Sequence, residues 1–432
     1  MNLIFPQLKT KIQLALEKYN NILLLLVFFT IPLFPKLNTV LIIVWCISSV
    51  IIFKRNQFYR IIQTREIILF FIFYFFLVVG VIYSTNISEG LLKLETQISL
   101  IVFPIFLGSR ENINKKFSTK ILYSFSFGCI IAGLICFVIA TYKFLVTEEL
   151  YIINAFGSKQ NIYFYNNFSE VLDIHPSYLS ICFSIASLFI LNQFLFKKEV
   201  KYKKTHLFLF LFLIIINLML ASKAGILSFT LIYIGYLLLI LKKSSKKKVI
   251  RLFFIPIIIF TIFFCFNSTL SGRFTQGISS LEDVVLNDKK INDPVGIRYH
   301  LWETSFYASK ENFFFGTGTG NVRTILYEEC IKRNFFSDCE MMRGMNSHNQ
   351  YLNILIANGI VGLILFILIL FYLFKKAIKK DKTIFLIFLL LFVINMFFES
   401  LLQREKGIIL FMSFTSLLIA NSLDLKSEKK KL

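Results

Sequence analysis

The sequence predicts an all-α, polytopic membrane protein with about twelve transmembrane helices and one large extracytoplasmic loop. First, 56% of its 432 residues are hydrophobic and 17% are aromatic, which is too apolar for a water-soluble domain of this length. Second, apolar runs of spanning length recur along the chain, with short clusters of Lys and Arg between them. Third, one long hydrophilic stretch interrupts this pattern in the C-terminal third.

Twelve apolar runs have roughly the length of a membrane span. We expect the first to remain in the protein, because Pro32 and Pro35 follow it rather than a small-residue cleavage site. The fourth carries Lys93 and Glu95 near its start. The runs cover residues 22–35, 37–53, 66–83, 91–108, 119–145, 173–196, 205–221, 224–241, 249–266, 349–374, 382–400 and 406–423.

This count divides the chain into four parts. Residues 1–266 form transmembrane helices 1–9, residues 267–348 a loop with short helices, residues 349–423 helices 10–12, and residues 424–432 a basic tail. When alternate loops are assigned to the cytoplasm, 31 of the 47 Lys and Arg residues lie on that side. Both termini are therefore predicted to be cytoplasmic, and the net charge of +22 reflects membrane anchoring rather than a nucleic-acid-binding face.

Two of the seven cysteines stand apart from the apolar runs. Cys330 and Cys339 lie in the long loop, where their spacing allows a disulfide if the loop faces an oxidising compartment. The sequence leaves open whether this bond forms. Metal ligation would need further His or Cys residues nearby, which the loop sequence does not supply.

The long loop contains one segment with a helical pattern, RYHLWETSFYASKENF. Tyr299, Trp302 and Phe306 recur at helical spacing, and the following GTGTGN ends the helix. We expect this helix to lie on the membrane surface with its aromatic side inward. The glycines do not match a phosphate-binding loop, because no strand precedes them; they predict a sharp turn with close backbone approach.

A His-Asn pair opens the apolar run that follows the long loop. His348 should lie where this span meets water, and the positive end of the helix should keep its imidazole neutral and basic. The alternative is that His348 and Asn349 only cap the helix and satisfy its free amides. The residues alone do not choose between a catalytic base and a cap.

Two other ionisable residues, Glu399 and His175, lie at the ends of apolar runs. Glu399 ends a run, where a carboxylate is costly unless it is paired. Pairing with Arg404 or Lys406 is the simpler explanation, and pairing with His348 or an outer-face arginine is the functional one. His175 precedes Pro176 and is expected to cap a helix or to line an outer cavity.

Five segments together resemble the O-antigen ligase and O-antigen polymerase superfamily of bacterial envelope enzymes. The resemblance covers roughly residues 174–414 and implies a multi-span membrane glycosyltransferase with a large periplasmic loop. The segments are HPSYLS at 175–180, ASKAG at 221–225, RYHLWETS to GTGTGN at 298–321, SHNQYLNILIANGIVG at 347–362 and ESLLQREKG at 399–407.

The resemblance implies that a glycan moves from undecaprenyl diphosphate to a lipid or sugar acceptor on the periplasmic face. His348 and Arg298 are then the catalytic candidates, as base and as cation for the leaving diphosphate. Lys223 stands where relatives commonly have arginine, which keeps the charge but loses the planar fork of donors. The substrate-binding candidates are Arg273, Lys223, Asn349, Glu399 and His175.

No cofactor or metal is expected, because the energy already resides in the lipid-linked donor and no nucleotide-binding signature is present. The expected partners are the donor, the acceptor and membrane lipids, in a bacterial inner membrane. The acceptor is left open: lipid A core for a ligase, or another lipid-linked repeat unit for a polymerase. A lipid-linked sugar transporter is the alternative of another class, but it would predict inverted repeats, and none is found.

Overall fold

The computed structural model describes residues 4–111, 113–153, 159–196, 202–241, 246–266, 268–287, 293–333, 339–379 and 382–428. The described chain is helical apart from one antiparallel hairpin, in which β1 (Tyr151–Ile153) pairs with β2 (Lys159–Asn161). The predicted all-α class is therefore confirmed, with this small hairpin as an addition.

The first part of the chain, up to residue 240, forms the helices before the hairpin and the helices that follow it. These elements are α1 (Ile4–Thr30), α2 (Pro35–Ile51), α3 (Arg55–Gln63), α4 (Arg65–Ile82), α5 (Ile87–Gln97), α6 (Ser99–Phe103), η1 (Pro104–Gly108), α7 (Lys115–Thr147), α8 (Asn166–Ser169), η2 (Glu170–Leu172), α9 (Pro176–Phe196), α10 (Lys203–Met219) and α11 (Lys223–Ile240).

The second half contains the helices of the long loop and the C-terminal spans. These elements are α12 (Lys246–Phe266), α13 (Ser268–Leu286), α14 (Pro294–Glu311), α15 (Val322–Arg333), η4 (Cys339–Met342), α16 (Gln350–Lys379), α17 (Thr383–Asn395), η5 (Leu401–Gln403) and α18 (Glu405–Glu428).

Each of the twelve predicted apolar runs falls largely on helix, but a count of twelve membrane spans is not confirmed. Among the described residues, seven helices are long and apolar enough to cross a membrane, or up to nine if each of two sharply bent pairs is one span. One bent pair is α2 with α3, at 111°, and the other joins the α12 and α13 segments at 90°. Helices α10 and α17 have only 17 and 13 residues.

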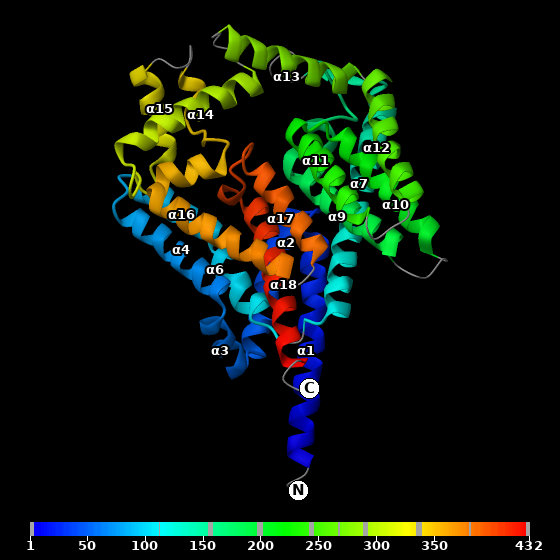
Figure 1. The fold of residues 1–432 in the computed structure, drawn as a ribbon, viewed down its shortest axis with the longest axis vertical. Coiled ribbons are helices and arrows are strands. Elements are labelled where there is room, and N and C mark those ends of the chain that lie inside the picture. Colours follow the sequence, from blue (N-terminus) through cyan, green and yellow to red (C-terminus); the bar gives the residue numbers. More distant parts are fainter. Residues whose placement is uncertain are drawn as a thin grey trace.

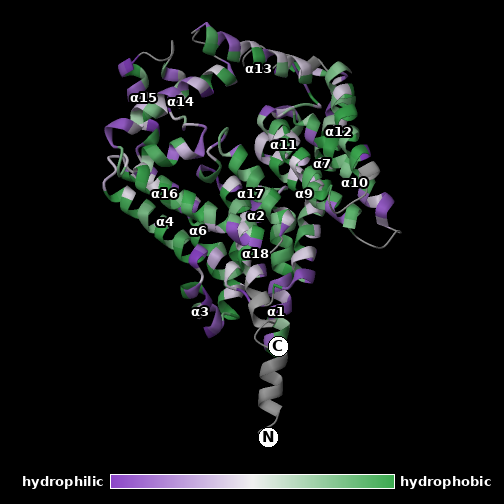
Figure 2. Cartoon of the chain, in the orientation of Figure 1, coloured by the Kyte–Doolittle hydropathy of each residue, from purple (hydrophilic) through white to green (hydrophobic). Residues whose placement is uncertain are grey.

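The helices form a bundle with the long-loop helices at one end (Figure 1). The end of α18 and the start of α1 lie at the opposite end, so both termini are on the same side of the bundle. Helix α13 runs across the top, from α12 towards α14 (Figure 1). Figure 2 shows hydrophobic residues along the bundle helices and hydrophilic residues gathered on α3 at one end and on α14 and α15 at the other.

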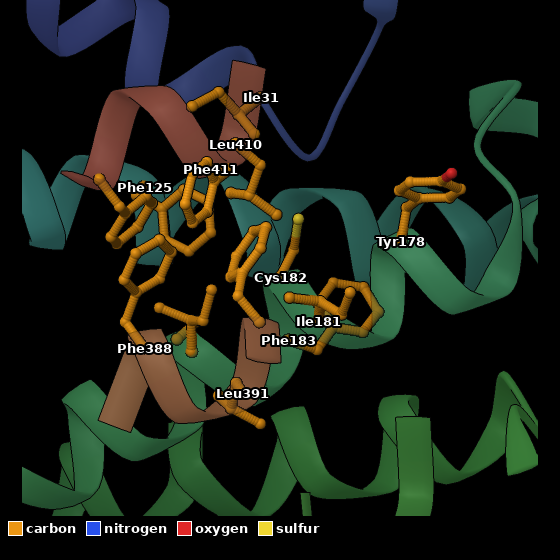
Figure 3. Packing of buried hydrophobic residues seen from close by; sticks show 14 of the residues in the cluster. Ile31, Phe125, Tyr178, Ile181, Cys182, Phe183, Phe388, Leu391, Leu410 and Phe411 are labelled. Carbon is orange, nitrogen blue, oxygen red and sulfur yellow. The ribbon is translucent and has the colours of Figure 1, made fainter. Parts of the chain in front are cut away.

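Aromatic and aliphatic side chains from five helices fill the centre of the bundle (Figure 3). The ring of Phe388 on α17 stacks on that of Phe414 on α18, with 4.8 Å between centroids. Phe125 of α7 and Phe28 of α1 approach the same Phe414 ring at 5.0 and 5.5 Å. This core holds α17 and α18 against α1, α7 and α9, and Tyr178 extends it towards the connection between α17 and α18.

The long-loop helix that the sequence predicted is α14, which begins at an Asp293 cap and a first-turn Pro294. Asp293 Oδ1 accepts hydrogen bonds from the amides of Val295 and Gly296. The aromatic residue Phe306 is 54% exposed, and the face of α14 that is buried in the protein is made mostly of small and polar residues. The buried side chains are His300, Leu301, Thr304, Ser305, Ala308 and Ser309. Contact of the aromatic side with the membrane surface stays a prediction.

A disulfide joins Cys330 at the end of α15 to Cys339 at the start of η4, which answers the question that the sequence left open. Cys330 is fully buried in a small separate core with Leu301 of α14 and Ile356 of α16. The bond therefore anchors the end of α15 against the helices on either side of the candidate site.

The glycine segment after α14 packs its backbone against a break in α16. Gly359 has a left-handed φ of 64° inside α16, which frees carbonyl groups there. The amide of Thr317 donates to the carbonyl of Ile356, and the amide of Gly318 to that of Ala357. These bonds satisfy backbone groups at membrane depth, which lipid cannot do. The predicted close approach of the glycine-segment backbone is confirmed, and the element that it approaches is helix α16.

We predict that Gly316→Ala destabilises the protein far more than Gly344→Ala. Both glycines have positive φ values, 76° and 77°, so both substitutions carry the same backbone strain of about 1 kcal/mol. A Cβ at Gly316 would lie 2.5 Å from the backbone of Ala357, whereas nothing lies within 4 Å of one at Gly344. Thermal unfolding in detergent measures the difference, and equal melting temperatures would contradict the packing role.

Candidate functional site

The start of α16 is fixed to the connection between α17 and α18 by a buried glutamine. The amide of Gln350 donates to the carbonyl of Met396, and Gln350 Oε1 accepts from the amide of Leu402. The hydroxyl of Tyr351 donates to the carbonyl of Val393. These three bonds hold the residues before α16 beside residues 396–402.

The structure separates the roles of His348 and Asn349. Asn349 Oδ1 accepts hydrogen bonds from the amides of Tyr351 and Leu352, so Asn349 caps α16. His348 lies one residue further out in a left-handed conformation with φ 45°, and its amide donates to Asn346 Oδ1. The imidazole is therefore not used as a cap. The Oδ1 atom of Asn349 is thus engaged by the helix amides, and contact between Asn349 and substrate stays a prediction.

Glu399 joins His348 to Arg298, which come from separate segments of the chain. Its Oε2 lies 3.1 Å from His348 Nδ1, and its Oε1 accepts a 2.7 Å hydrogen bond from Arg298 Nη2. Arg298 also donates to the carbonyls of Phe398 and Pro294. The simpler prediction for Glu399, pairing with Arg404 or Lys406, is wrong.

The Glu399 carboxylate is buried, with only 10% of its side chain exposed. Burial alone would raise its pKa, but the hydrogen bond from His348 and the charge of Arg298 outweigh burial and lower the pKa from 4.5 to about 2. Glu399 is therefore ionised at any physiological pH. Because a carboxylate only accepts, His348 Nδ1 must carry the proton, and Nε2 is left with a free lone pair when the ring is neutral.

A polar cavity of about 780 Å³ opens on the His348 side of this group. His348, Glu399 and Arg298 line it together with residues from α5, α9, α15 and the start of α18. His175 also lines it, and its Nδ1 accepts from the amide of Ser177, so this residue both caps α9 and faces the cavity. Burial lowers the pKa of His175, which keeps its ring neutral near neutral pH.

An apolar groove of about 310 Å³ opens on the other side of Arg298. Lys223 at the start of α11 and Arg273 on α13 line it with Arg298, among the side chains of Leu281, Trp302 and others. The Arg273 guanidinium lies 3.4 Å over the ring of Tyr165, and its Nε donates to the carbonyl of Ala221. Arg298 lines both the groove and the polar cavity, so it stands where the two meet.

The structure thus brings six of the seven predicted site residues together, with Asn349 beside them in a capping role. Sequence reasoning missed Lys93, Arg323 and Arg404 as residues of the site. Arg323 lines the polar cavity and pairs with Glu89, 234 positions earlier in the sequence. No local pattern signals a contact over such a separation.

The residues from 208 to 367 match the family model described as O-antigen ligase. This match, over 160 of the 432 residues, supports a relationship to the O-antigen ligase superfamily. The matched segment contains Lys223, Arg273, Arg298 and His348, while His175 and Glu399 lie outside it. The match supports a membrane enzyme of the O-antigen ligase or polymerase type, and together with the apolar helices it is consistent with a bacterial inner membrane protein.

A relative in Haemophilus influenzae, described as an uncharacterized protein, is 24% identical to this chain over 410 residues. The similar region covers 91% of this chain and 96% of the relative. The likeness to the relative therefore covers most of this chain and nearly all of the relative.

The low pKa of Glu399 predicts how stability depends on pH. A carboxyl whose pKa falls from 4.5 to about 2 on folding contributes stability above pH 4.5 and loses it as the pH falls towards 2. This shift corresponds to roughly 3 kcal/mol. We therefore expect Glu399→Gln to lower the melting temperature at pH 7, and the gap from wild type to shrink below about pH 4.5.

Glu328→Gln is the matched control, because Glu328 is an exposed carboxylate on α15. It should leave the melting temperature nearly unchanged between pH 7 and pH 3. A Glu399→Gln variant as stable as wild type at pH 7 would contradict the proposed balance of charges.

Proposed function

We propose that the protein transfers a glycan from a polyprenyl diphosphate carrier to an acceptor hydroxyl on the outer face of the bacterial inner membrane. The observation that carries this proposal is the arrangement around Glu399, whose two oxygens hold a histidine and an arginine side by side. The histidine faces a polar cavity, and the arginine stands between this cavity and an apolar groove. Such an arrangement suits a polar acceptor and an amphipathic donor that meet at one point.

The donor occupies the groove side in this proposal. A polyprenyl chain requires an apolar surface, which Leu281 and Trp302 supply, and a diphosphate requires cations, which Lys223, Arg273 and Arg298 supply. Arginine presents planar donors that match phosphate oxygens. The diphosphate then lies near Arg298, with the glycan directed into the polar cavity.

His348 acts as the base. The acceptor oxygen attacks the anomeric carbon, the bond between this carbon and the diphosphate oxygen breaks, and the acceptor proton passes to His348 Nε2. Glu399 orients the ring through Nδ1 and stabilises the imidazolium that forms, while Arg298 stabilises the charge that develops on the diphosphate. Glu399 thus couples the base and the cation of one reaction.

The orientation of the protein follows from the same proposal. The long-loop helices and the candidate site lie at the end of the bundle away from the chain termini (Figure 1). With the termini in the cytoplasm, as the positive-inside rule predicts, the site opens to the periplasm. A substituted-cysteine labelling experiment at the exposed Lys332 tests this, and labelling only from the cytoplasmic side would contradict it.

We predict that His348→Ala lowers glycan transfer by about 10²- to 10⁴-fold, as expected for loss of a general base, while folded protein still accumulates in the membrane. Some loss of stability is expected as well, because buried Glu399 loses one hydrogen bond. Arg298→Lys keeps the charge but loses the fork of donors, and should lower transfer by roughly tenfold or more. The measurement is the surface glycan ladder and the lipid-linked pool in a deletion strain that carries each variant.

Lys332→Gln is the control, because Lys332 is exposed on α15 and lies outside both cavities. It should restore the wild-type profile. Long polymer retained on the carrier in the His348→Ala strain would indicate a ligase, and single repeat units would indicate a polymerase. Full transfer by His348→Ala would remove the proposed base.

A further inference from the structure

A second group of cations lines the polar cavity, apart from the Arg298 group. Lys93 comes from α5, Arg323 from α15 and Arg404 from the residue before α18. Lys93 Nζ lies 3.5 Å from Glu89 Oε1, and Arg323 Nη1 lies 3.2 Å from the same oxygen. One carboxylate thus serves two cations, and Arg404 makes no ion pair with any residue in the described part of the chain.

The other carboxylates of the cavity are engaged elsewhere. Glu399 binds His348 and Arg298, as described above. Glu170 pairs with Lys143 at 2.9 Å, and Asp173 lies 3.9 Å from Lys406. Glu405 accepts a hydrogen bond from the hydroxyl of Thr39 on α2. The Lys93, Arg323 and Arg404 group therefore carries more positive than negative charge.

The group is also incompletely satisfied. Arg323 Nε is buried and has no hydrogen-bond partner among the described residues, although a third of the Arg323 side chain remains exposed. The three side chains line the same cavity, and the charges of Arg323 and Arg404 each act on Lys93. Holding like charges together is unfavourable unless an anion joins them, and unpaired guanidinium donors are suited to a phosphate or carboxylate.

The position of these three cations indicates a role in binding the acceptor rather than the donor. The three cations line the polar cavity that His348 faces, and none of them lines the apolar groove. Tyr178 also lines the cavity, and it interacts electrostatically with both Glu399 and Arg404. The cavity therefore runs continuously from the candidate base to this second group of cations.

We propose that Lys93, Arg323 and Arg404 form a subsite for an anionic group, a phosphate or carboxylate, on the sugar of the acceptor. This inference rests on the proposed function, since it assigns the polar cavity to the acceptor. It makes the enzyme selective for acceptors that carry a negative charge at a fixed distance from the hydroxyl that reacts.

The test measures binding of simple probes to the purified full chain in nanodiscs of neutral lipid. Glucose 1-phosphate and glucuronate are the charged probes, and glucose is the neutral one. The main variant is Arg323→Gln with Arg404→Gln, which leaves Lys93 to pair with Glu89 and so avoids an unpaired carboxylate. Arg404→Gln alone serves if the double variant does not fold, because Arg404 makes no ion pair in the described structure.

We expect the charged probes to bind the wild type and glucose to bind much more weakly. The double variant should weaken binding of the charged probes by about tenfold or more, the scale of one lost charge-assisted contact. A double variant with Arg404→Lys in place of Arg404→Gln should recover part of the lost affinity for the charged probes. The control Arg343→Gln, an exposed arginine outside the cavity, should bind as the wild type does.

Arg298→Gln separates this subsite from the proposed diphosphate site. Loss of probe binding in Arg298→Gln but not in the double variant would overturn the subsite. The subsite would also be overturned if no sugar probe bound and the protein were stabilised only in nanodiscs that contain an anionic lipid. That result would assign the three cations to a lipid headgroup. The two proposals can also be told apart. If His348→Ala retains glycan transfer while the double variant no longer binds the charged probes, the anionic subsite is supported and the role of His348 as base is refuted.

Discussion

The candidate site depends on one buried carboxylate. Glu399 lies in the short connection between α17 and α18, and it binds His348 from the start of α16 with one oxygen and Arg298 from α14 with the other. Burial of an unpaired carboxylate costs several kcal/mol, so these three segments are held together by the need to satisfy it. The same pairing fixes the tautomer of His348 and the position of Arg298 between the two cavities.

The rest of the fold serves to hold this connection in place. The aromatic core around Phe414 packs α17 and α18 against α1, α7 and α9, so the connection cannot shift without disturbing the bundle. Gln350 ties the start of α16 to the same connection. The glycine segment supports α16 at its break, and the disulfide anchors α15 nearby. A rigid base and cation can thus face a cavity open to bulky polar substrates.

Two kinds of positive charge have different functions in this molecule. Most Lys and Arg residues lie in the loops and tails that the positive-inside rule assigns to the cytoplasm, where they anchor the helices. Several of those at the opposite end line cavities, and these cations have distinct environments. Lys223 and Arg273 lie in an apolar groove that suits a lipid diphosphate, whereas Lys93, Arg323 and Arg404 line the polar cavity.

The sequence by itself determined the helical membrane class and the resemblance to the O-antigen ligase superfamily, and it selected His348, Arg298 and Glu399, because apolar length and polar residues at span ends are local patterns. It did not determine the number of spans, since bends such as that between α12 and α13 depend on packing. Only the tertiary structure separated the cap Asn349 from the base His348 and placed Arg323 beside Glu89, because these outcomes depend on contacts between residues far apart in the chain.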